Sequence, residues 1–189
     1  MADFSIAPID IGGYIIDMAF SDDNRGSFTK LFEQEAFKQG GIDFSCSESF
    51  VSCSDKNVVR GLHFQTFRPQ AKLVSVISGK IYDVIVDLRK GSGTYGQWRG
   101  YYLSSENHKA LYVPRGFAHG FLSLCEGSAV LYQCDGAYDK DSDTGVLFCD
   151  GDIGIKWPVQ PSQMTVGARD RGLMTFKEFD NKYSGGMQV

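Results

Sequence analysis

The chain has 189 residues, of which 42% are hydrophobic, 13% aromatic and 22% charged, an ordinary composition for one soluble domain. A chain of this length buries about 70% of its unfolded surface, so neither disulfides nor a structural metal are needed to hold a core. Nineteen Lys and Arg against 23 Asp and Glu give a formal charge of −4, which excludes a general nucleic-acid binder.

The first residues contain no basic segment followed by an apolar one, and no uncharged apolar run approaches 18 residues. The five cysteines, an odd number without a Cys-x-x-Cys pair, are expected to be reduced thiols. We therefore expect a cytoplasmic protein of one domain, residues 1–189, that binds neither nucleic acid nor membrane. The last residues, 184–189, are expected to form a frayed tail.

Short apolar runs separated by turn residues predict an all-β chain with little helix. In chain order, residues 31–39 are expected to form a short helix that stops at a Gly-Gly pair. Residues 72–77 and 80–88 are rich in β-branched side chains and are joined by a Ser-Gly step, which predicts a tight hairpin. Further strands are expected over residues 98–103, 109–113, 120–123, 129–134 and 146–148, and a second short helix over residues 170–179. Strands at this spacing indicate an antiparallel sandwich or barrel.

Two of the three histidines lie in conspicuous segments. Pro114, Gly116 and His119 have the Pro-x-Gly-x-x-His spacing, which resembles the second motif of cupin β-barrels. A metal-binding cupin also supplies a His-x-His pair from its first motif, whereas here His63 is followed by Phe and Gln. We therefore expect a cupin-type antiparallel β-barrel or jelly roll with a few short helices and without a metal.

Seven segments between residues 20 and 172 carry a more specific pattern. They are residues 23–28, 58–65, 70–74, 83–89, 114–121, 131–134 and 154–158, and include Val-Val-Arg-Gly-Leu-His-Phe-Gln at 58–65. In this order they resemble the dTDP-4-dehydrorhamnose 3,5-epimerase family. The resemblance implies a cofactor-independent enzyme that inverts C3, C5 or both of a nucleotide-linked 4-keto-6-deoxy sugar through an enolate.

The resemblance assigns four residues to this chemistry. The protons on C3 and C5 flank the C4 carbonyl, so their removal gives an enolate whose oxygen must be stabilised. His63 matches the base, and Asp170 matches the acidic partner that orients the imidazole. Lys72 matches a lysine near the C4 oxygen, and Tyr132 matches the tyrosine that returns a proton from the opposite face of the ring. Taken alone, Asp170 is also consistent with a helix cap, Lys72 with an edge charge and Tyr132 with a core aromatic.

Further positions match residues that contact the substrate in the family. Arg25 and Arg60 match contacts to the diphosphate, for which the guanidinium fork is suited. His119 lines the same pocket, and Tyr138 matches an aromatic beside the nucleotide base. Arg25 follows two aspartates and is also consistent with a surface ion pair, while strict strand alternation directs Arg60 away from the face of His63.

The chain departs from the family pattern at four positions that lie near the substrate in the family, and three of them, Lys30, Glu48 and Arg169, are expected to bind it. Lys30 replaces a common glutamate, Glu48 a glutamine, Phe50 an asparagine and Arg169 a lysine. These changes leave open which sugar and which nucleotide base are bound. The resemblance also implies a homodimer in which N-terminal strands are exchanged, and a pathway that supplies a surface polysaccharide or a glycosylated metabolite.

Three rival functions remain open from the sequence. The first is a ketoisomerase on the same scaffold, which moves the carbonyl from C4 to C3, but the joint presence of Lys72 and Tyr132 favours epimerisation. The second is a non-catalytic carbohydrate-binding barrel, and the third is a metal-dependent cupin oxygenase.

Overall fold

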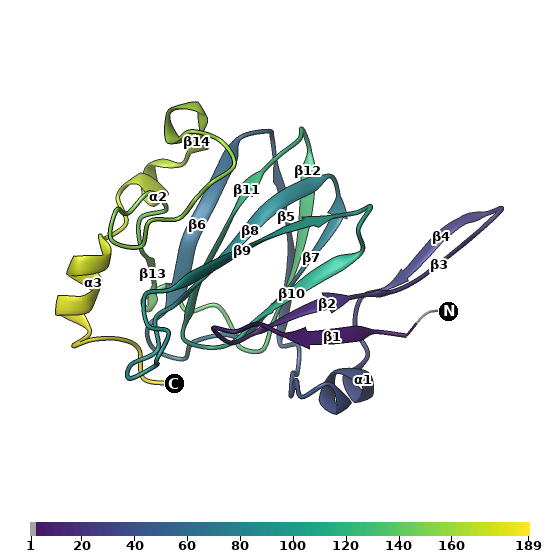
Figure 1. Cartoon of the computed structure of the whole chain (residues 1–189), viewed down its shortest axis with the longest axis horizontal. Helices are drawn as coiled ribbons and strands as arrows, with labels where there is room; N and C mark the ends of the chain where they lie inside the picture. The colour runs from purple at the N-terminus through teal and green to yellow at the C-terminus, as the bar shows by residue number, and fades with distance from the viewer. Residues whose placement is uncertain (1–2) are drawn as a thin grey trace.

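The computed structural model of the chain describes residues 3–189, which form two large sheets that face each other (Figure 1). The first sheet contains, in spatial order, β1 (Ser5–Pro8), β2 (Tyr14–Asp17), β10 (Lys109–Val113), β7 (Lys72–Ser78), β12 (Ser128–Cys134) and β5 (Glu48–Ser54). All of its neighbouring strands are antiparallel. Strand β5 is therefore one edge of this sheet and contacts β12 along its whole length.

The second sheet packs against the first. It contains, in spatial order, β13 (Asp143–Gly145), β6 (Val58–Gln65), β11 (Phe117–Ser123), β8 (Lys80–Asp87) and β9 (Trp98–Ser104), and β14 (Thr165–Val166) pairs with β6 in parallel. The largest core cluster lies between the sheets, with Val74 and Val130 from the first and Ile85 and Phe121 from the second almost fully buried. The predicted all-β, jelly-roll fold with a few short helices is confirmed.

The tight hairpin predicted between residues 72–77 and 80–88 is wrong. Strand β7 pairs with β10 and β12, whereas β8 pairs with β11 and β9 in the other sheet. The chain turns a corner between the sheets after Ser78. Val76 of β7 and Ile81 of β8 are both buried in the same core cluster, so the two strands face each other across the core.

A two-stranded ribbon extends from the body of the molecule (Figure 1). It consists of β3 (Ala19–Asp23) and β4 (Gly26–Lys30), and most of its residues are half-buried or exposed. Phe20 stacks on His108 near its base, with ring centroids 3.8 Å apart. The residues around the turn of the ribbon, 22–28, are all exposed, and Phe28 is 53% exposed.

Short helices occupy the positions that the sequence indicates, with different bounds. The first, α1 (Gln34–Gln39), begins three residues later than predicted. The second predicted helix is broken at Gly172 into α2 (Ala168–Arg171) and α3 (Phe176–Lys182), which begins at a capping box of Thr175 and Glu178. A 3-10 turn, η1 (Pro161–Gln163), precedes β14.

Two further expectations about the C-terminal half are wrong. Residues 146–148 form no strand: Val146 makes one bridge to Met174, and the strand β13 ends just before it. The expectation of a frayed tail is wrong for Met187, which is 5% exposed and pairs with Arg89. Its backbone N–H donates to the Leu88 carbonyl, and its own carbonyl accepts from the Lys90 N–H.

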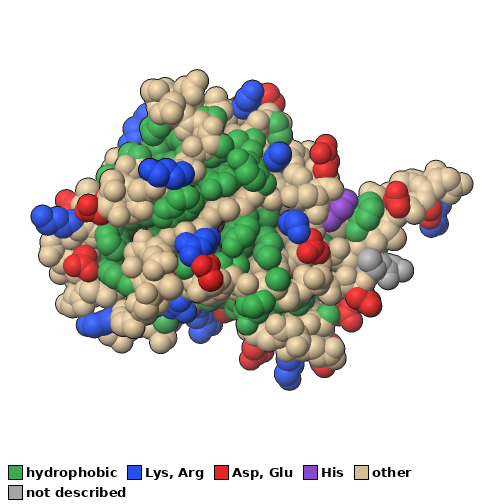
Figure 2. All heavy atoms as spheres, viewed as in Figure 1, with side chains coloured by type: hydrophobic (Ala, Val, Ile, Leu, Met, Phe, Trp, Pro, Cys, Tyr) green, Lys and Arg blue, Asp and Glu red, His purple; other side chains and the backbone are tan. Residues whose placement is uncertain are grey.

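The outer face of β8 and β9 carries hydrophobic side chains, while charged side chains are scattered over the rest of this view (Figure 2). Tyr82 of β8, Trp98 of β9 and Trp157 of the C-terminal segment are packed against a buried cluster that includes Phe179 of α3. The C-terminal segment therefore covers part of the second sheet. Between residues 3 and 189, no helix combines the length and the apolar character needed to cross a membrane.

Candidate active site

A cleft of about 810 Å³ opens between the two sheets, where β5, β7 and β12 of the first and β6 and β11 of the second meet the C-terminal segment. Its lining includes seven residues that the sequence assigned to the site: Arg60, His63, Lys72, His119, Tyr132, Arg169 and Asp170. The structure brings these residues together from four strands and one helix. The volume lies in the range of small-molecule sites, roughly 300–1,000 Å³.

His63 and Asp170 form a hydrogen-bonded pair in this cleft. His63 Nε2 lies 2.7 Å from Asp170 Oδ1, and the backbone N–H of Gly61 donates to Asp170 Oδ2 at 3.0 Å. Burial raises the pKa of Asp170, but the hydrogen bonds from His63 and Gly61 outweigh it and hold the pKa below its ordinary value. The ionised carboxylate can only accept, so Nε2 of His63 donates to it, and in the neutral imidazole Nδ1 is the nitrogen that can take a proton.

A β-bulge in β6 explains why Arg60 shares the cleft with His63. His119 pairs with His63 and Phe121 pairs with Arg60, so three steps along β6 match two along β11. The extra residue resets the alternation, and the objection from strict alternation is therefore wrong for Arg60. Gly61, within the bulge, has φ +102°, and a Cβ there would lie 2.6 Å from the carbonyl oxygen of His119. The backbones of β6 and β11 approach closely at this point.

The neighbouring strand gives a second His–Asp pair. His119 Nε2 lies 2.5 Å from Asp83 Oδ1, and both residues are almost completely buried. Within residues 3–189, the second oxygen of Asp83 has no hydrogen-bond partner. The sequence assigned no role to Asp83, although a carboxylate inside the apolar run of residues 81–86 is a signal that could have found it. Because His63 and His119 are cross-strand partners, the two pairs stand side by side.

Tyr132 and Lys72 lie on the first sheet, across the cleft from β6. Tyr132 is 8% exposed; burial raises the pKa of its phenol well above the ordinary value of 10, and the charge of Asp83 raises it further. The phenol is therefore protonated at neutral pH. Burial lowers the pKa of the half-buried Lys72 ammonium, an effect that the charges of Cys134, Asp143 and Asp83 oppose. The face of the Tyr132 ring is covered by Phe50, with ring centroids 4.9 Å apart and planes at 12°.

A smaller cavity of about 190 Å³ adjoins the cleft and shares Phe50, His63, Lys72 and Arg169 with it. Three of the residues expected to bind substrate form a network here: Glu48 accepts from the backbone N–H of Tyr138 at 2.7 Å, and Arg169 donates to Asp143 at 2.6 Å. The Tyr138 hydroxyl also donates to Asp143 at 3.0 Å. Asp143 was not singled out from the sequence, because a lone aspartate in a polar turn carries no signal.

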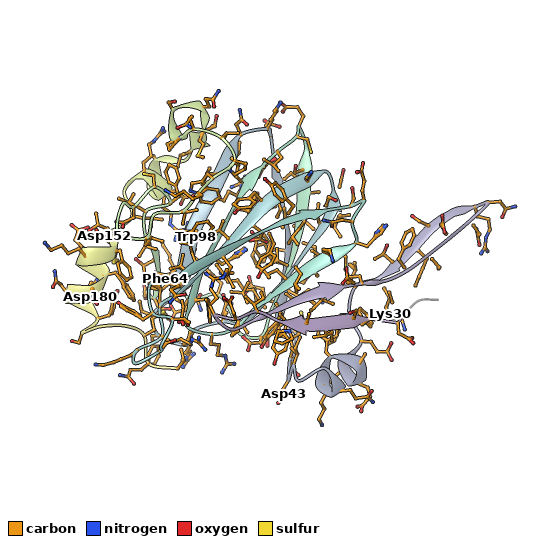
Figure 3. All side chains as sticks on the ribbon, viewed as in Figure 1. Lys30, Asp43, Phe64, Trp98, Asp152 and Asp180 are labelled. Atoms are coloured by element: carbon orange, nitrogen blue, oxygen red, sulfur yellow. The ribbon has the colours of Figure 1, made fainter. Side chains whose placement is uncertain are left out.

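Two expected substrate contacts lie elsewhere. Arg25, at the end of the ribbon, donates to Asp23 at 2.6 Å and its side chain is 86% exposed, so the surface ion pair is present. Lys30 pairs with Glu33. Figure 3 shows Lys30 far from Phe64, the neighbour of His63 on β6. The structure therefore does not bring Arg25 or Lys30 to the cleft of their own chain.

In the part of the chain from residue 3 to residue 189, no group of three His, Cys, Asp or Glu side chains is arranged to hold a metal ion.

Comparison with known proteins identifies the family. The chain matches the family profile described as dTDP-4-dehydrorhamnose 3,5-epimerase over residues 9–178. It is 41% identical over 180 residues to the dTDP-4-dehydrorhamnose 3,5-epimerase of Methanothermobacter thermautotrophicus. The aligned residues make up 94% of this chain and 97% of that protein. The chain belongs to the dTDP-4-dehydrorhamnose 3,5-epimerase family. It is an epimerase and thus an isomerase, and the predicted family and enzyme class are confirmed.

Solved structures agree with this assignment. The epimerase superposes with a TM-score of 0.91 on a dTDP-6-deoxy-D-glucose-3,5-epimerase from Legionella pneumophila in complex with dTDP-4-keto-L-rhamnose, at 34% identity and covering 98% and 100% of the two chains. It also resembles a 3'-monoepimerase from Streptomyces bikiniensis in complex with dTDP-quinovose, with a TM-score of 0.86, 29% identity and 95% and 91% coverage. The comparisons favour an epimerase over the ketoisomerase and the non-catalytic barrel.

Proposed function

We propose that this epimerase inverts C3, C5 or both of a 4-keto-6-deoxyhexose carried on a nucleoside diphosphate. The observation that carries the proposal is the placement of the His63–Asp170 pair and Tyr132 in one cleft of about 810 Å³. A base and a proton donor in one cavity large enough for a hexose are the two groups that inversion beside a ketone requires.

The first step is removal of a proton. Nδ1 of His63 takes the hydrogen from the carbon next to the C4 carbonyl, and the electron pair of the C–H bond moves into an enolate with its charge on the C4 oxygen. Asp170 holds the imidazole through Nε2 and stabilises the imidazolium that forms. Lys72 lies on the lining of both cavities, where an ammonium lowers the energy of the enolate relative to the ketone.

The second step returns a proton from the other face. The O–H bond of Tyr132 breaks, a C–H bond forms on the face opposite His63, and the enolate collapses to the ketone with inverted configuration. The phenolate then regains a proton from solvent, and the imidazolium of His63 loses one. The two transfers balance without a cofactor.

The remaining polar residues fit the nucleotide end of such a substrate. Arg60 is held against β5 by hydrogen bonds to Ser54 Oγ at 2.9 Å and to the carbonyl of Cys53 at 3.0 Å, and it supplies a guanidinium for the diphosphate. His119 lines the sugar side. Tyr138, Glu48 and Arg169 line the smaller cavity and are assigned to the base end. Because two solved relatives hold dTDP-linked sugars, dTDP is the first carrier to test.

The exposed ribbon supports the proposed homodimer. It leaves Arg25 and Phe28 exposed far from the cleft of their own chain. We propose that β3 and β4 reach a second copy of this single-domain, cytoplasmic protein, and that Arg25 and Lys30 complete the partner's site. Such an exchange explains why two expected substrate contacts lie outside the cleft.

The test is incubation with dTDP-, CDP- and GDP-linked 4-keto-6-deoxyhexoses in deuterated water, with NMR detection of label and configuration at C3 and C5. An epimerase incorporates deuterium and inverts; a binding protein incorporates none, and a ketoisomerase forms the 3-keto product. A deuterium exchange rate that is lower by about 10²-fold or more in His63→Ala supports the assignment of His63 as the base. Wild-type exchange in that variant contradicts it, and loss of activity after chelation would favour a metal-dependent enzyme.

A further inference from the structure

Phe50 and Tyr132 form a face-to-face aromatic pair across two strands. They are direct partners in the pairing of β5 with β12, and their rings are 4.9 Å apart at an angle of 12°. Phe50 lines the cleft and is 45% exposed, whereas Tyr132 is 8% exposed. Phe50 therefore lies between the open cleft and one face of the Tyr132 ring.

The position of the Tyr132 ring is set by packing. Within residues 3–189, burial and nearby charges act on its hydroxyl without a hydrogen bond, so no polar contact fixes where the O–H points. The edge of the His119 ring meets it with centroids 5.7 Å apart and planes at 72°. Phe50 covers the remaining face, and Ser49 holds the strand by donating to the Tyr132 carbonyl at 3.1 Å. Two rings thus hold the phenol.

We propose that Phe50 is a positioning residue for proton return: its ring holds the Tyr132 phenol in line with the substrate and keeps water away from that side of the cleft. This inference rests on the proposed function. Phe50 touches Tyr132 and is not itself a proton donor, so its effect is confined to the second half of the reaction.

The fate of the enolate separates this role from a general structural one. If His63 returns a solvent-derived proton to the original face, the carbon exchanges its hydrogen and keeps its configuration. If Tyr132 donates, the carbon is inverted. The ratio of exchange to inversion therefore measures the efficiency of Tyr132. Loss of folding or of substrate binding lowers both rates together and leaves the ratio unchanged.

The experiment compares two variants. Phe50→Leu removes the flat ring but keeps apolar bulk, whereas Phe50→Tyr keeps the flat ring. Phe67→Leu is the matched control, because Phe67 is an aromatic residue 67% exposed that lines neither cavity. In deuterated water we expect the exchange-to-inversion ratio to rise about tenfold or more in Phe50→Leu, since small displacements of a reacting group cost up to ~10²-fold. Phe50→Tyr and Phe67→Leu should retain the wild-type ratio.

Each outcome has one meaning. An unchanged ratio in Phe50→Leu, or an equal rise in Phe50→Tyr, overturns the positioning role while leaving the proposed function intact. A wild-type protein that neither exchanges nor inverts any of the tested sugars overturns the proposed function itself. Because β5 is an edge strand and Phe50 is half exposed, the Leu variant is expected to fold. Phe50→Met repeats the test with a different apolar side chain.

Discussion

Replacing Asp170 by Asn tests the base most directly, because it changes one atom. In the wild-type protein the Asp170 carboxylate accepts from two donors, His63 Nε2 at 2.7 Å and the Gly61 N–H at 3.0 Å. The Gly61 N–H can only donate, so the amide oxygen of Asn must face it and the NH₂ must face Nε2. Nε2 then becomes the acceptor, and the ring hydrogen moves to Nδ1, the atom that has to take the substrate proton.

The expected loss follows from this change of tautomer. General-base catalysis contributes about 10²–10⁴-fold, and the same Asp-to-Asn change in a serine protease triad costs about 10⁴-fold. We therefore expect Asp170→Asn to lower the deuterium exchange rate by about 10²–10⁴-fold, or ~2.7–5.4 kcal/mol of barrier. The substrate KM should change little. The control is Asp152→Asn, an exposed aspartate near α3 (Figure 3) that lines neither cavity.

The same variant predicts a change in acid stability. The folded-state pKa of Asp170 lies below its ordinary value of 3.8, so its carboxylate stabilises the fold fully above that value and loses this contribution as the pH falls through the folded pKa. Wild-type thermal stability should fall more steeply than that of Asp170→Asn below about pH 4, measured by calorimetry. Exchange in Asp170→Asn within a few-fold of wild type, or parallel acid-stability curves, would refute the reasoning.

Three further predictions concern the rest of the site. Lys72→Met should lower exchange by about 10²–10³-fold through loss of enolate stabilisation, with nucleotide affinity retained in calorimetric titration; a near-wild-type rate contradicts it. Gly61→Ala should destabilise the fold by about 1–3 kcal/mol, because a Cβ there has φ +102° and lies 2.6 Å from the His119 carbonyl. Scanning calorimetry should then show a Tm lower by roughly 2–12 °C, and an unchanged Tm would count against the bulge argument. Arg25→Ala should raise KM about tenfold or more without changing Tm, whereas an unchanged KM would argue against the exchanged ribbon.

Much of the core was predictable from local pattern, and its topology was not. Strands such as β10 and β12 are evident because β-branched and aromatic residues follow each other between turns. The same pattern cannot tell whether consecutive strands pair or face each other, and so it predicts one hairpin for β7 and β8. The first strands escape the pattern because β1 and β4 are mostly exposed and lack an apolar alternation.

The candidate site depended on contacts between distant residues. His63 and Asp170 are 107 positions apart, and only the family resemblance connected them before the structure did. Alternation gave the wrong face for Arg60, because a single inserted residue in β6 cannot be seen without its partner strand. Asp83 shows the opposite case: its burial follows from the apolar run around it, but its partner His119 lies on another strand.

The close approach of β6 and β11 limits how this site can diversify. A Cβ at Gly120 of β11 would lie 2.5 Å from the Arg60 carbonyl oxygen on β6. A Cβ at Gly61 of β6 would in turn lie 2.6 Å from the His119 carbonyl oxygen on β11. The wall that carries both histidines therefore accepts almost no new side chains. The opposite margin, β5, ends its sheet and has half of its side chains in solvent. New sugar preferences, whether evolved or selected from a library, are expected to arise from mutations at residues 48–52, with the proton-abstracting wall kept as it is.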